Sequence, residues 1–320
     1  MKPILIISVG LALFASMSLT CQAGGHAYIT NQGGNNVSVI DLENNQVIAT
    51  IAVGKAPVGV AVSAKLAKVF ISNVDGQSIS IIDSNSNQVI EELPIKGSPV
   101  GLALSPDSSV LYVADWFDDR VLAINTGNLQ QQRVVAIGKA PAGMVVSPDG
   151  KRLYVANRDS NDVAVIDTVA LHVLSRIPVG AHPYGLALSP DGIQLYAVNV
   201  HAGTVSVVNT SNNQSHTVKV GEHPYCVTVS ADGQRAYVSN TQGDSVSVID
   251  AAQKKVIATI AVGAFPEGIS FDQAKQRVYV ANWFDNTVSV IDAASNQLVA
   301  SIPTGDKSRA FGQFIIEATH

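Results

Sequence analysis

A repeat of about 42 residues runs through almost the whole chain. The segment LYVANRDSNDVAVID at residues 153–167 returns as VYVANWFDNTVSVID at residues 278–292. One aromatic position of this segment recurs at nearly equal intervals, at Tyr28, Phe70, Tyr112, Tyr154, Tyr196, Tyr237 and Tyr279. A fixed period of this length indicates a solenoid or a propeller.

Each repeat carries four short β-strand signals. In the unit that begins at Leu153 they are LYVAN, VAVID, HVLSRIPVG and GLALSPDG, separated by Gly, Pro, Asn and Asp. Four strands in each repeat of this length correspond to one propeller blade. The sequence therefore predicts an all-β protein, a seven-bladed β-propeller of four-stranded antiparallel blades that forms one domain over residues 24–320.

The phase of the repeat predicts how the ring closes. The repeats begin on a second strand, at residues 27–30, and end on FGQFII at residues 311–316, which aligns with the first-strand segment VGVAVS at residues 58–63. A blade of only three strands would leave an unpaired edge. We therefore expect the C-terminal strand, residues 311–316, to pair with the blade formed by residues 27–52.

These repeats resemble a known family. YITN, YVAN, YVSN, VSVID, ATIAVG and SPDG are similar to the motifs of the YVTN-repeat family of secreted seven-bladed β-propellers, over nearly all of residues 24–320. The resemblance implies the propeller fold and export to a periplasm or a cell surface. It implies little about activity, because one fold hosts many unrelated functions.

Residues 1–23 differ from the repeats. A positive start at Lys2, an apolar run over residues 4–19 and the sequence CQA at residues 21–23 are typical of a signal peptide cleaved after Ala23. An uncleaved membrane span and a lipoprotein acylated at Cys21 are the alternatives. No later segment is apolar for long enough to cross a membrane. After cleavage Cys226 would be the only cysteine and could form no intramolecular disulfide.

Composition narrows the range of partners. There are 20 Lys and Arg residues against 25 Asp and Glu, so extensive binding to nucleic acid is not expected, although a local basic patch could exist. The sequence contains no C-x-x-C-H motif, which excludes covalent c-type haem. The Asp or Asn at the end of the VAVID-type strand of each repeat, such as Asp167, is expected to form an Asx turn rather than a catalytic site.

The repeats differ most in the loops that lead into the innermost strands, which we call the mouth loops. With the loops between second and third strands they should form one face, the top. Most mouth loops follow G-x-x-P-x-G, and one arc of them is polar and aromatic. The residues expected to bind a ligand there are His182, Tyr184, His201, His223, Tyr225, Phe265, Glu267, Lys307 and Arg309, together with Trp116 and Trp283 in the motifs DWFDDR and NWFDNT.

Three kinds of site could use these residues. His182, His201, His223 and Glu267 could hold a divalent metal such as zinc or copper. His182, His223, Glu267 and Arg309 could serve a lactonase or a lyase as acid, base and electrophile. The two Trp-Phe pairs could recognise a protein, a glycan or a small-molecule ligand, or they could pack between blades.

We expect a secreted or periplasmic binding or scaffold module that acts through its top face, with no cofactor. An enzyme at the mouth, with or without a metal, and a surface or adhesion protein are the alternatives.

Overall fold

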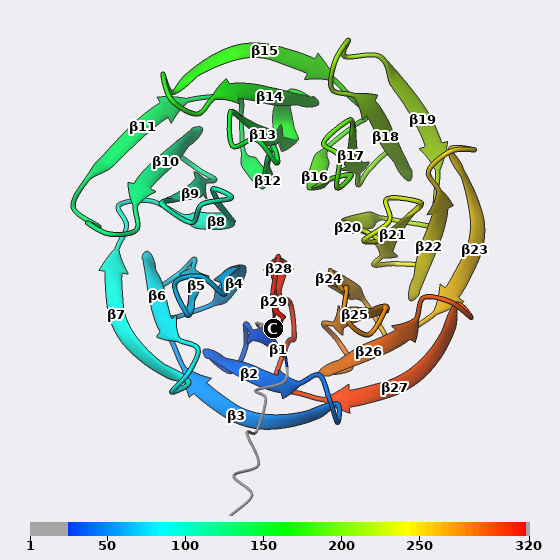
Figure 1. Cartoon of the computed structure of the whole chain (residues 1–320), viewed down its shortest axis with the longest axis horizontal. Helices are drawn as coiled ribbons and strands as arrows, with labels where there is room; N and C mark the ends of the chain where they lie inside the picture. The colour runs from blue at the N-terminus through cyan, green and yellow to red at the C-terminus, as the bar shows by residue number, and fades with distance from the viewer. Residues whose placement is uncertain (1–24, 318–320) are drawn as a thin grey trace, which may run out of the picture.

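The computed structural model describes residues 25–317, and their strands form seven sheets around a central axis (Figure 1). Each sheet has four antiparallel strands, and one of them gains a short fifth strand. Within the described residues the only helical element is the 3₁₀ turn η1 (Arg158–Ser160). The seven-bladed β-propeller predicted from the repeat is confirmed.

We number the blades along the chain. Blade 1 consists of β1 (His26–Asn31), β2 (Asn36–Asp41) and β3 (Gln46–Ala52), with β29 (Ile315–Ile316). Blade 2 consists of β4 (Pro57–Ser63), β5 (Lys68–Asn73), β6 (Ser78–Asp83) and β7 (Gln88–Pro94), with β28 (Phe311–Gly312). Blade 3 consists of β8 (Pro99–Leu104), β9 (Val110–Asp115), β10 (Arg120–Asn125) and β11 (Gln132–Ala136).

Blades 4 to 7 follow the same order from axis to rim. Blade 4 consists of β12 (Pro141–Val146), β13 (Arg152–Asn157), β14 (Asp162–Asp167) and β15 (His172–Pro178). Blade 5 consists of β16 (Pro183–Leu188), β17 (Gln194–Asn199), β18 (Thr204–Asn209) and β19 (Ser215–Lys219). Blade 6 consists of β20 (Pro224–Val229), β21 (Arg235–Asn240), β22 (Ser245–Asp250) and β23 (Lys255–Ala261), and blade 7 of β24 (Pro266–Asp272), β25 (Arg277–Asn282), β26 (Thr287–Asp292) and β27 (Gln297–Pro303).

The repeated aromatic residues form the core between blades. All seven are 2% exposed or less. The Tyr28 hydroxyl donates to Asn87 Oδ1 of blade 2 at 2.9 Å, and the Tyr279 hydroxyl donates to Asn45 Oδ1 of blade 1 at 2.8 Å. Burying such a side chain stabilises the fold by about 1.5–3 kcal/mol, so the sequence period is also the period of the hydrophobic core.

The ring closes through the C-terminal strand, as predicted. Ile315 pairs with Ala27 in antiparallel register, and the Tyr28 amide donates to the Phe314 carbonyl at 2.8 Å. The structure adds a feature that the sequence did not predict: β28 pairs in parallel with β4 of blade 2, at Phe311 and Gly59. The segment at residues 311–316 is therefore split between two blades.

Close contact at the axis explains the glycine in most innermost strands. A Cβ atom on Gly143 would lie 2.3 Å from the Tyr184 carbonyl oxygen of the next blade, a distance that no real contact tolerates. Cys226 occupies the same repeat position in blade 6, where it is a buried free thiol. The expected Asx turns also form, for example where Asp167 accepts from the Val169 amide at 2.9 Å.

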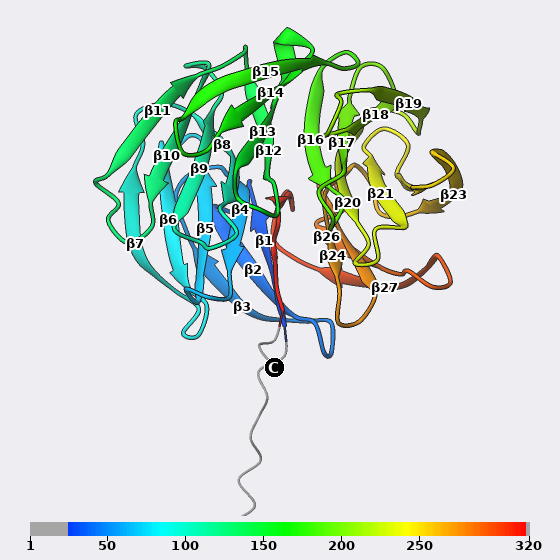
Figure 2. The same cartoon turned by 45° about the horizontal axis from the view of Figure 1, so that its top comes forward.

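Residues 1–24 lie outside the described part of the chain, and so does the predicted signal peptide with Cys21. Within residues 25–317, no helix has the length and apolar character needed to cross a membrane. In the view of Figure 2, β28 and β29 run through the centre of the ring towards the bottom face, where the turns between first and second strands lie.

Candidate functional site

Two repeat positions surround the mouth of the channel on the top face. The first precedes the glycine of each innermost strand, or Cys226 in blade 6, at Val58, Val100, Ala142, Tyr184, Tyr225, Glu267 and Phe311. The second follows the polar residue that ends each second strand, at Gln32, Val74, Trp116, Arg158, Val200, Thr241 and Trp283. Backbone bonds join the two sets of loops, as where the Val74 amide donates to the Ala56 carbonyl at 3.1 Å. The predicted top face is thus formed.

Arg309 is the centre of the polar contacts at this mouth. Its Nε lies 2.7 Å from Glu267 Oε2, an ion pair in which neither atom has hydrogen-bond alignment. Its Nη1 donates to Gln32 Oε1 at 3.0 Å, and its Nη2 donates to the Tyr225 hydroxyl at 2.5 Å. The Glu267 side chain is 4% exposed and that of Arg309 is 19% exposed. One arginine therefore links blades 1, 6 and 7.

Burial controls the ionisation of the groups beside this arginine. Loss of water raises the pKa of Glu267, and the Arg309 charge only partly opposes that shift. Burial, with Glu267 nearby, raises the pKa of the Cys226 thiol well above its usual range. The thiol is therefore protonated at neutral pH and is a weak nucleophile. Cys226 is thus a small buried thiol.

Aromatic rings close the channel below Arg309. The Tyr184 ring centroid lies 4.4 Å from that of Tyr225, 4.9 Å from that of Phe311 and 5.8 Å from that of Trp116. Tyr184 and Phe311 are 7% and 3% exposed. Such tilted ring pairs contribute about 0.5–1.5 kcal/mol each beyond the area that they bury. These rings separate a hollow on the top face from a larger channel beneath.

The hollow on the top face has a volume of about 190 Å³. It is lined by Gln32, Val58, Val74, Ser98, Val100, Trp116, Phe117, Tyr184 and Arg309. Trp116 and Tyr184 form an aromatic wall, and Gln32 and Arg309 supply polar groups. Of the side chains predicted for the site, Trp116, Tyr184 and Arg309 line the hollow.

The three histidines gather in a separate group. The ring centroids of His182 and His201 are 4.0 Å apart, and those of His201 and His223 are 5.8 Å apart. Burial, with Arg158 and His201 nearby, lowers the pKa of His182. His182 and His223 have left-handed backbone conformations, with φ of 55° and 48°. The three histidines thus lie next to one another on the top face.

The predicted metal set does not assemble with them. Among residues 25–317, no group of three or more His, Cys, Asp or Glu side chains is placed to hold a metal ion. The physical reason is that Glu267 is buried against Arg309, whereas the three imidazole rings lie beside one another in tilted pairs. Of the predicted catalytic set, only Glu267 and Arg309 are in direct contact.

The two Trp-Phe pairs are each half packed and half exposed. Trp116 packs on Tyr184, while Phe117 is 76% exposed. Trp283 lies 5.8 Å from Phe265 between ring centroids, with the Lys307 ammonium 5.2 Å from its ring, and Phe284 is 63% exposed. The phenylalanines, rather than the tryptophans, are thus the exposed members of both pairs.

Sequence reasoning missed several lining residues of the hollow, among them Gln32, Val74 and Ser98. A signal for Gln32 was present, because it occupies the same repeat position as Trp116 and Trp283. Its contact with Arg309 joins residues from opposite ends of the chain, and the repeat pattern contains no information about that pair.

Comparisons with known proteins agree on the fold. Residues 102–204 match the family described as YNCE-like beta-propeller. Kuenenia stuttgartiensis hydrazine synthase has a similar structure, with a TM-score of 0.77, 20% identity and coverage of 88% of this chain and 99% of that one. A functionally unknown protein from Desulfotomaculum acetoxidans DSM 771 has a TM-score of 0.76, 13% identity and coverage of 90% and 99%.

Dihydro-heme d1 dehydrogenase NirN, solved in complex with DHE, has a TM-score of 0.70, 14% identity and coverage of 92% of this chain and 75% of that one. At these identities the likeness concerns the fold alone. A 40-residue segment is 58% identical to the PE-PGRS family protein PE_PGRS18 of Mycobacterium tuberculosis. That match spans 12% of this chain and only 9% of the relative. The chain is a β-propeller.

Proposed function

We propose that the protein is a binding module that docks a protein partner on its top face, outside the cytoplasm. The observation that carries the proposal is the pair of exposed phenylalanines, Phe117 and Phe284, on loops of blades 3 and 7. These blades lie on opposite sides of the mouth (Figure 1). A partner that contacts both would cover the hollow between them.

The size of the hollow favours a protein over a small molecule. Pockets that enclose a drug-sized ligand measure about 300–1,000 Å³, whereas this one has about 190 Å³. That space suits a single inserted side chain, with Trp116 and Tyr184 as its apolar wall. Buried aromatic contacts of this kind dominate the energy of protein interfaces.

The charges at the mouth support binding more than catalysis. Arg309 and Glu267 neutralise each other, and Arg309 also donates to Gln32 and Tyr225. The neighbouring thiol of Cys226 is held in its protonated form. Export is proposed on the predicted signal segment and on the resemblance to secreted propellers.

Photocrosslinking in intact cells tests the proposal. The substitutions Phe117→p-benzoylphenylalanine and Phe284→p-benzoylphenylalanine place reactive groups on the two sides of the mouth. Ile257→p-benzoylphenylalanine is the matched control, because Ile257 is 43% exposed on the outer strand β23. We expect both top positions, but not the control, to yield an adduct with the same protein.

The identified partner then allows a measurement of affinity. Phe117→Ala and Trp116→Ala should each weaken its binding by about tenfold or more, whereas Ile257→Ala should leave the Kd unchanged. Adducts from the control position alone would show that the outer rim is the interface. Binding of purified protein to oligosaccharides, without any protein adduct from the top face, would favour a glycan ligand.

A further inference from the structure

A second and larger cavity lies beneath the aromatic rings and is independent of the top hollow. It has a volume of about 600 Å³, and Phe311 and Cys226 line its upper end. Ala64, Lys65, Pro106, Pro190 and Ala231, in the turns between first and second strands, line its lower end. The cavity therefore opens on the bottom face, away from the site proposed above.

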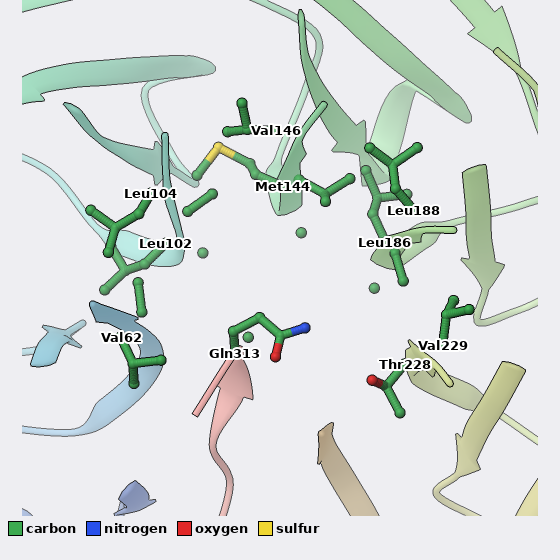
Figure 3. A pocket seen from close by; sticks show the side chains of 18 of the residues that line it. Val62, Leu102, Leu104, Met144, Val146, Leu186, Leu188, Thr228, Val229 and Gln313 are labelled. Atoms are coloured by element: carbon green, nitrogen blue, oxygen red, sulfur yellow. The ribbon is translucent and has the colours of Figure 1, made fainter. Parts of the chain in front are cut away.

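Aliphatic and polar residues both line this lower channel. Figure 3 shows the aliphatic side chains around a common space, where they also pack between neighbouring blades: Val62, Leu102, Leu104, Met144, Val146, Leu186, Leu188 and Val229. The polar residues of the lining include Ser105, Thr228 and Gln313. A cavity of this size is large enough to enclose a small ligand.

The backbone of the wall is open to hydrogen bonding. Among the described strands, β8, β12, β16 and β20 each pair on one side only, with β9, β13, β17 and β21. Their other edges face the axis (Figure 1). Unpaired edges present rows of N–H and C=O groups that can accept an added strand. A peptide could form backbone hydrogen bonds with these edges and also contact the side chains of the lining.

The chain itself uses this wall in that way. Its segment β28 pairs in parallel with the inner edge of β4, at Phe311 with Gly59 and Gly312 with Val60. The next residue, Gln313, extends into the channel in Figure 3, and its Oε1 accepts from the Ser270 hydroxyl at 3.0 Å. The inner edge of one blade is thus already occupied by an extended segment, while those of four others are unpaired.

The charge at the opening indicates the polarity of the occupant. Among the lining residues Lys65 is the only one with a charged side chain, and it is exposed at the lower end. Its ammonium donates to the Asp107 carbonyl at 3.0 Å, and its charge helps to lower the pKa of the nearby Asp107 carboxylate. No carboxylate lines the cavity itself, so Lys65 is the side chain of the lining that can bind an anionic end group.

We propose that the lower channel binds a short free peptide of about six residues, in extended conformation and with small apolar side chains. Its backbone adds as a strand to one of the unpaired inner edges, its side chains contact the aliphatic wall, and its terminal carboxylate lies near Lys65. An innermost strand such as β8 has six residues, so the bound segment has about the same length.

The probe for this proposal is an acetylated hexapeptide of alternating alanine and valine with a free carboxylate, titrated by calorimetry. We expect saturable binding below about 1 mM. Methylation of alternate backbone nitrogens removes hydrogen-bond donors and keeps the apolar surface. We expect it to weaken binding at least tenfold. Amidation of the carboxylate should weaken it about two- to fivefold.

Variants of the protein place the binding in the channel. Leu188→Trp fills the cavity and should abolish binding, whereas Ile193→Trp, at an exposed residue outside the lining, should not change it. Lys65→Gln should remove the preference for the free carboxylate. Because Lys65 is exposed, this variant still tests the site if Leu188→Trp does not fold.

Three results would overturn the proposal. No binding at 1 mM means that the channel is not a peptide site. Equal binding of the backbone-methylated peptide means that the wall recognises apolar surface alone, and tighter binding of dodecanoate than of the peptide would then assign the channel to an aliphatic amphiphile. Unchanged binding in both Leu188→Trp and Lys65→Gln means that the peptide binds elsewhere.

Discussion

Arg309 Nε lies 2.7 Å from Glu267 Oε2, across the boundary between the last mouth loop and the innermost strand of blade 7. The carboxylate is almost fully buried, so its charge depends on this one arginine. A buried ion pair adds little net stability, but the loss of one partner leaves an uncompensated charge. This contact joins the C-terminal segment to the rest of the ring.

The first prediction concerns this pair. Arg309→Met leaves the Glu267 carboxylate buried without its cation and should lower the free energy of unfolding by about 3 kcal/mol at neutral pH. Burial already raises the pKa of Glu267, and removal of the arginine raises it further. In the variant, Glu267 is buried without cost only while it is protonated and uncharged. The variant therefore loses stability as pH rises through the raised pKa of Glu267 in the folded state.

Urea unfolding at two pH values checks this sign. The free energy of unfolding that Arg309→Met loses relative to the parent protein should be smaller at pH 4.5 than at pH 7.5. Lys151→Met, at an exposed position, provides the control and should stay within about 0.5 kcal/mol. A deficit that is equal at both pH values would show that the loss comes from packing and not from the buried charge.

The second prediction concerns an exception in blade 3. Six repeats end the second strand with a buried Asn, but blade 3 has the fully buried Asp115, whose Oδ2 accepts from Arg120 Nε at 2.9 Å. Arg120→Ser should cost about 3 kcal/mol. The double variant Asp115→Asn with Arg120→Ser reproduces the Asn73 and Ser78 pair of blade 2 and should unfold within about 1 kcal/mol of the parent protein. A double variant as unstable as the single one would refute the exchange.

The third prediction concerns ring closure. Phe314 is fully buried, and its carbonyl accepts from the Tyr28 amide. Phe314→Ala should cost about 3–5 kcal/mol because it leaves a cavity, and deletion of residues 311–320 should cost more and broaden the thermal transition. Calorimetry provides the measurement. A truncated chain that melts like the full chain would contradict the closure by β29.

The fourth prediction concerns the group of three histidines. The equivalent mouth-loop positions in blades 2 and 4 hold Ala56 and Ala140, with the same left-handed φ near 50°. The double variant His182→Ala with His223→Ala should therefore change stability by less than about 0.5 kcal/mol. The partner identified by photocrosslinking should bind the double variant as tightly as it binds the parent protein, because neither histidine lines the hollow. A loss of several kcal/mol would make the histidines structural, and a loss of affinity would extend the binding surface to them.

The fifth prediction concerns the thiol of Cys226. It is buried and its pKa is raised, so Ellman's reagent should react with it only as fast as the protein opens. The rate should rise with urea through the unfolding transition. Cys226→Ala provides the blank. Fast reaction in the native state would show that the upper end of the channel is open to solvent.

The repeat alone predicted the blades, their number and the closing strand, because the period of the tyrosines is also the period of packing. It did not predict the contacts of Arg309, since that residue lies in the one mouth loop that departs from the pattern and binds Gln32 from the start of the ring. The separation of Glu267 from the three histidines has a related reason. Sequence placed Glu267 and the histidines on one face, but their partners there are set by contacts across the mouth.

The lower channel was also hidden in the sequence. Its lining comes from the alternating residues of the innermost strands, such as Leu102 and Leu104, whose pattern is the same as that of a strand buried on one face. Only the closed ring shows that these strands surround an axis with open space between them. A hydrophobic pattern identifies a covered face but does not distinguish packed atoms from an open space.

The pairing of β29 with β1 has a consequence for the order of assembly. Blade 1 contains the first strand of the propeller, yet its sheet cannot be completed until Ile315 and Ile316 have been synthesised. During translation the strands of blades 2 to 7 are therefore all synthesised while blade 1 is still incomplete and the edge of β1 is unpaired. Closure over nearly the full length of the chain is slow because of its high contact order, so a chaperone that recognises exposed strand edges would have its longest opportunity at that edge.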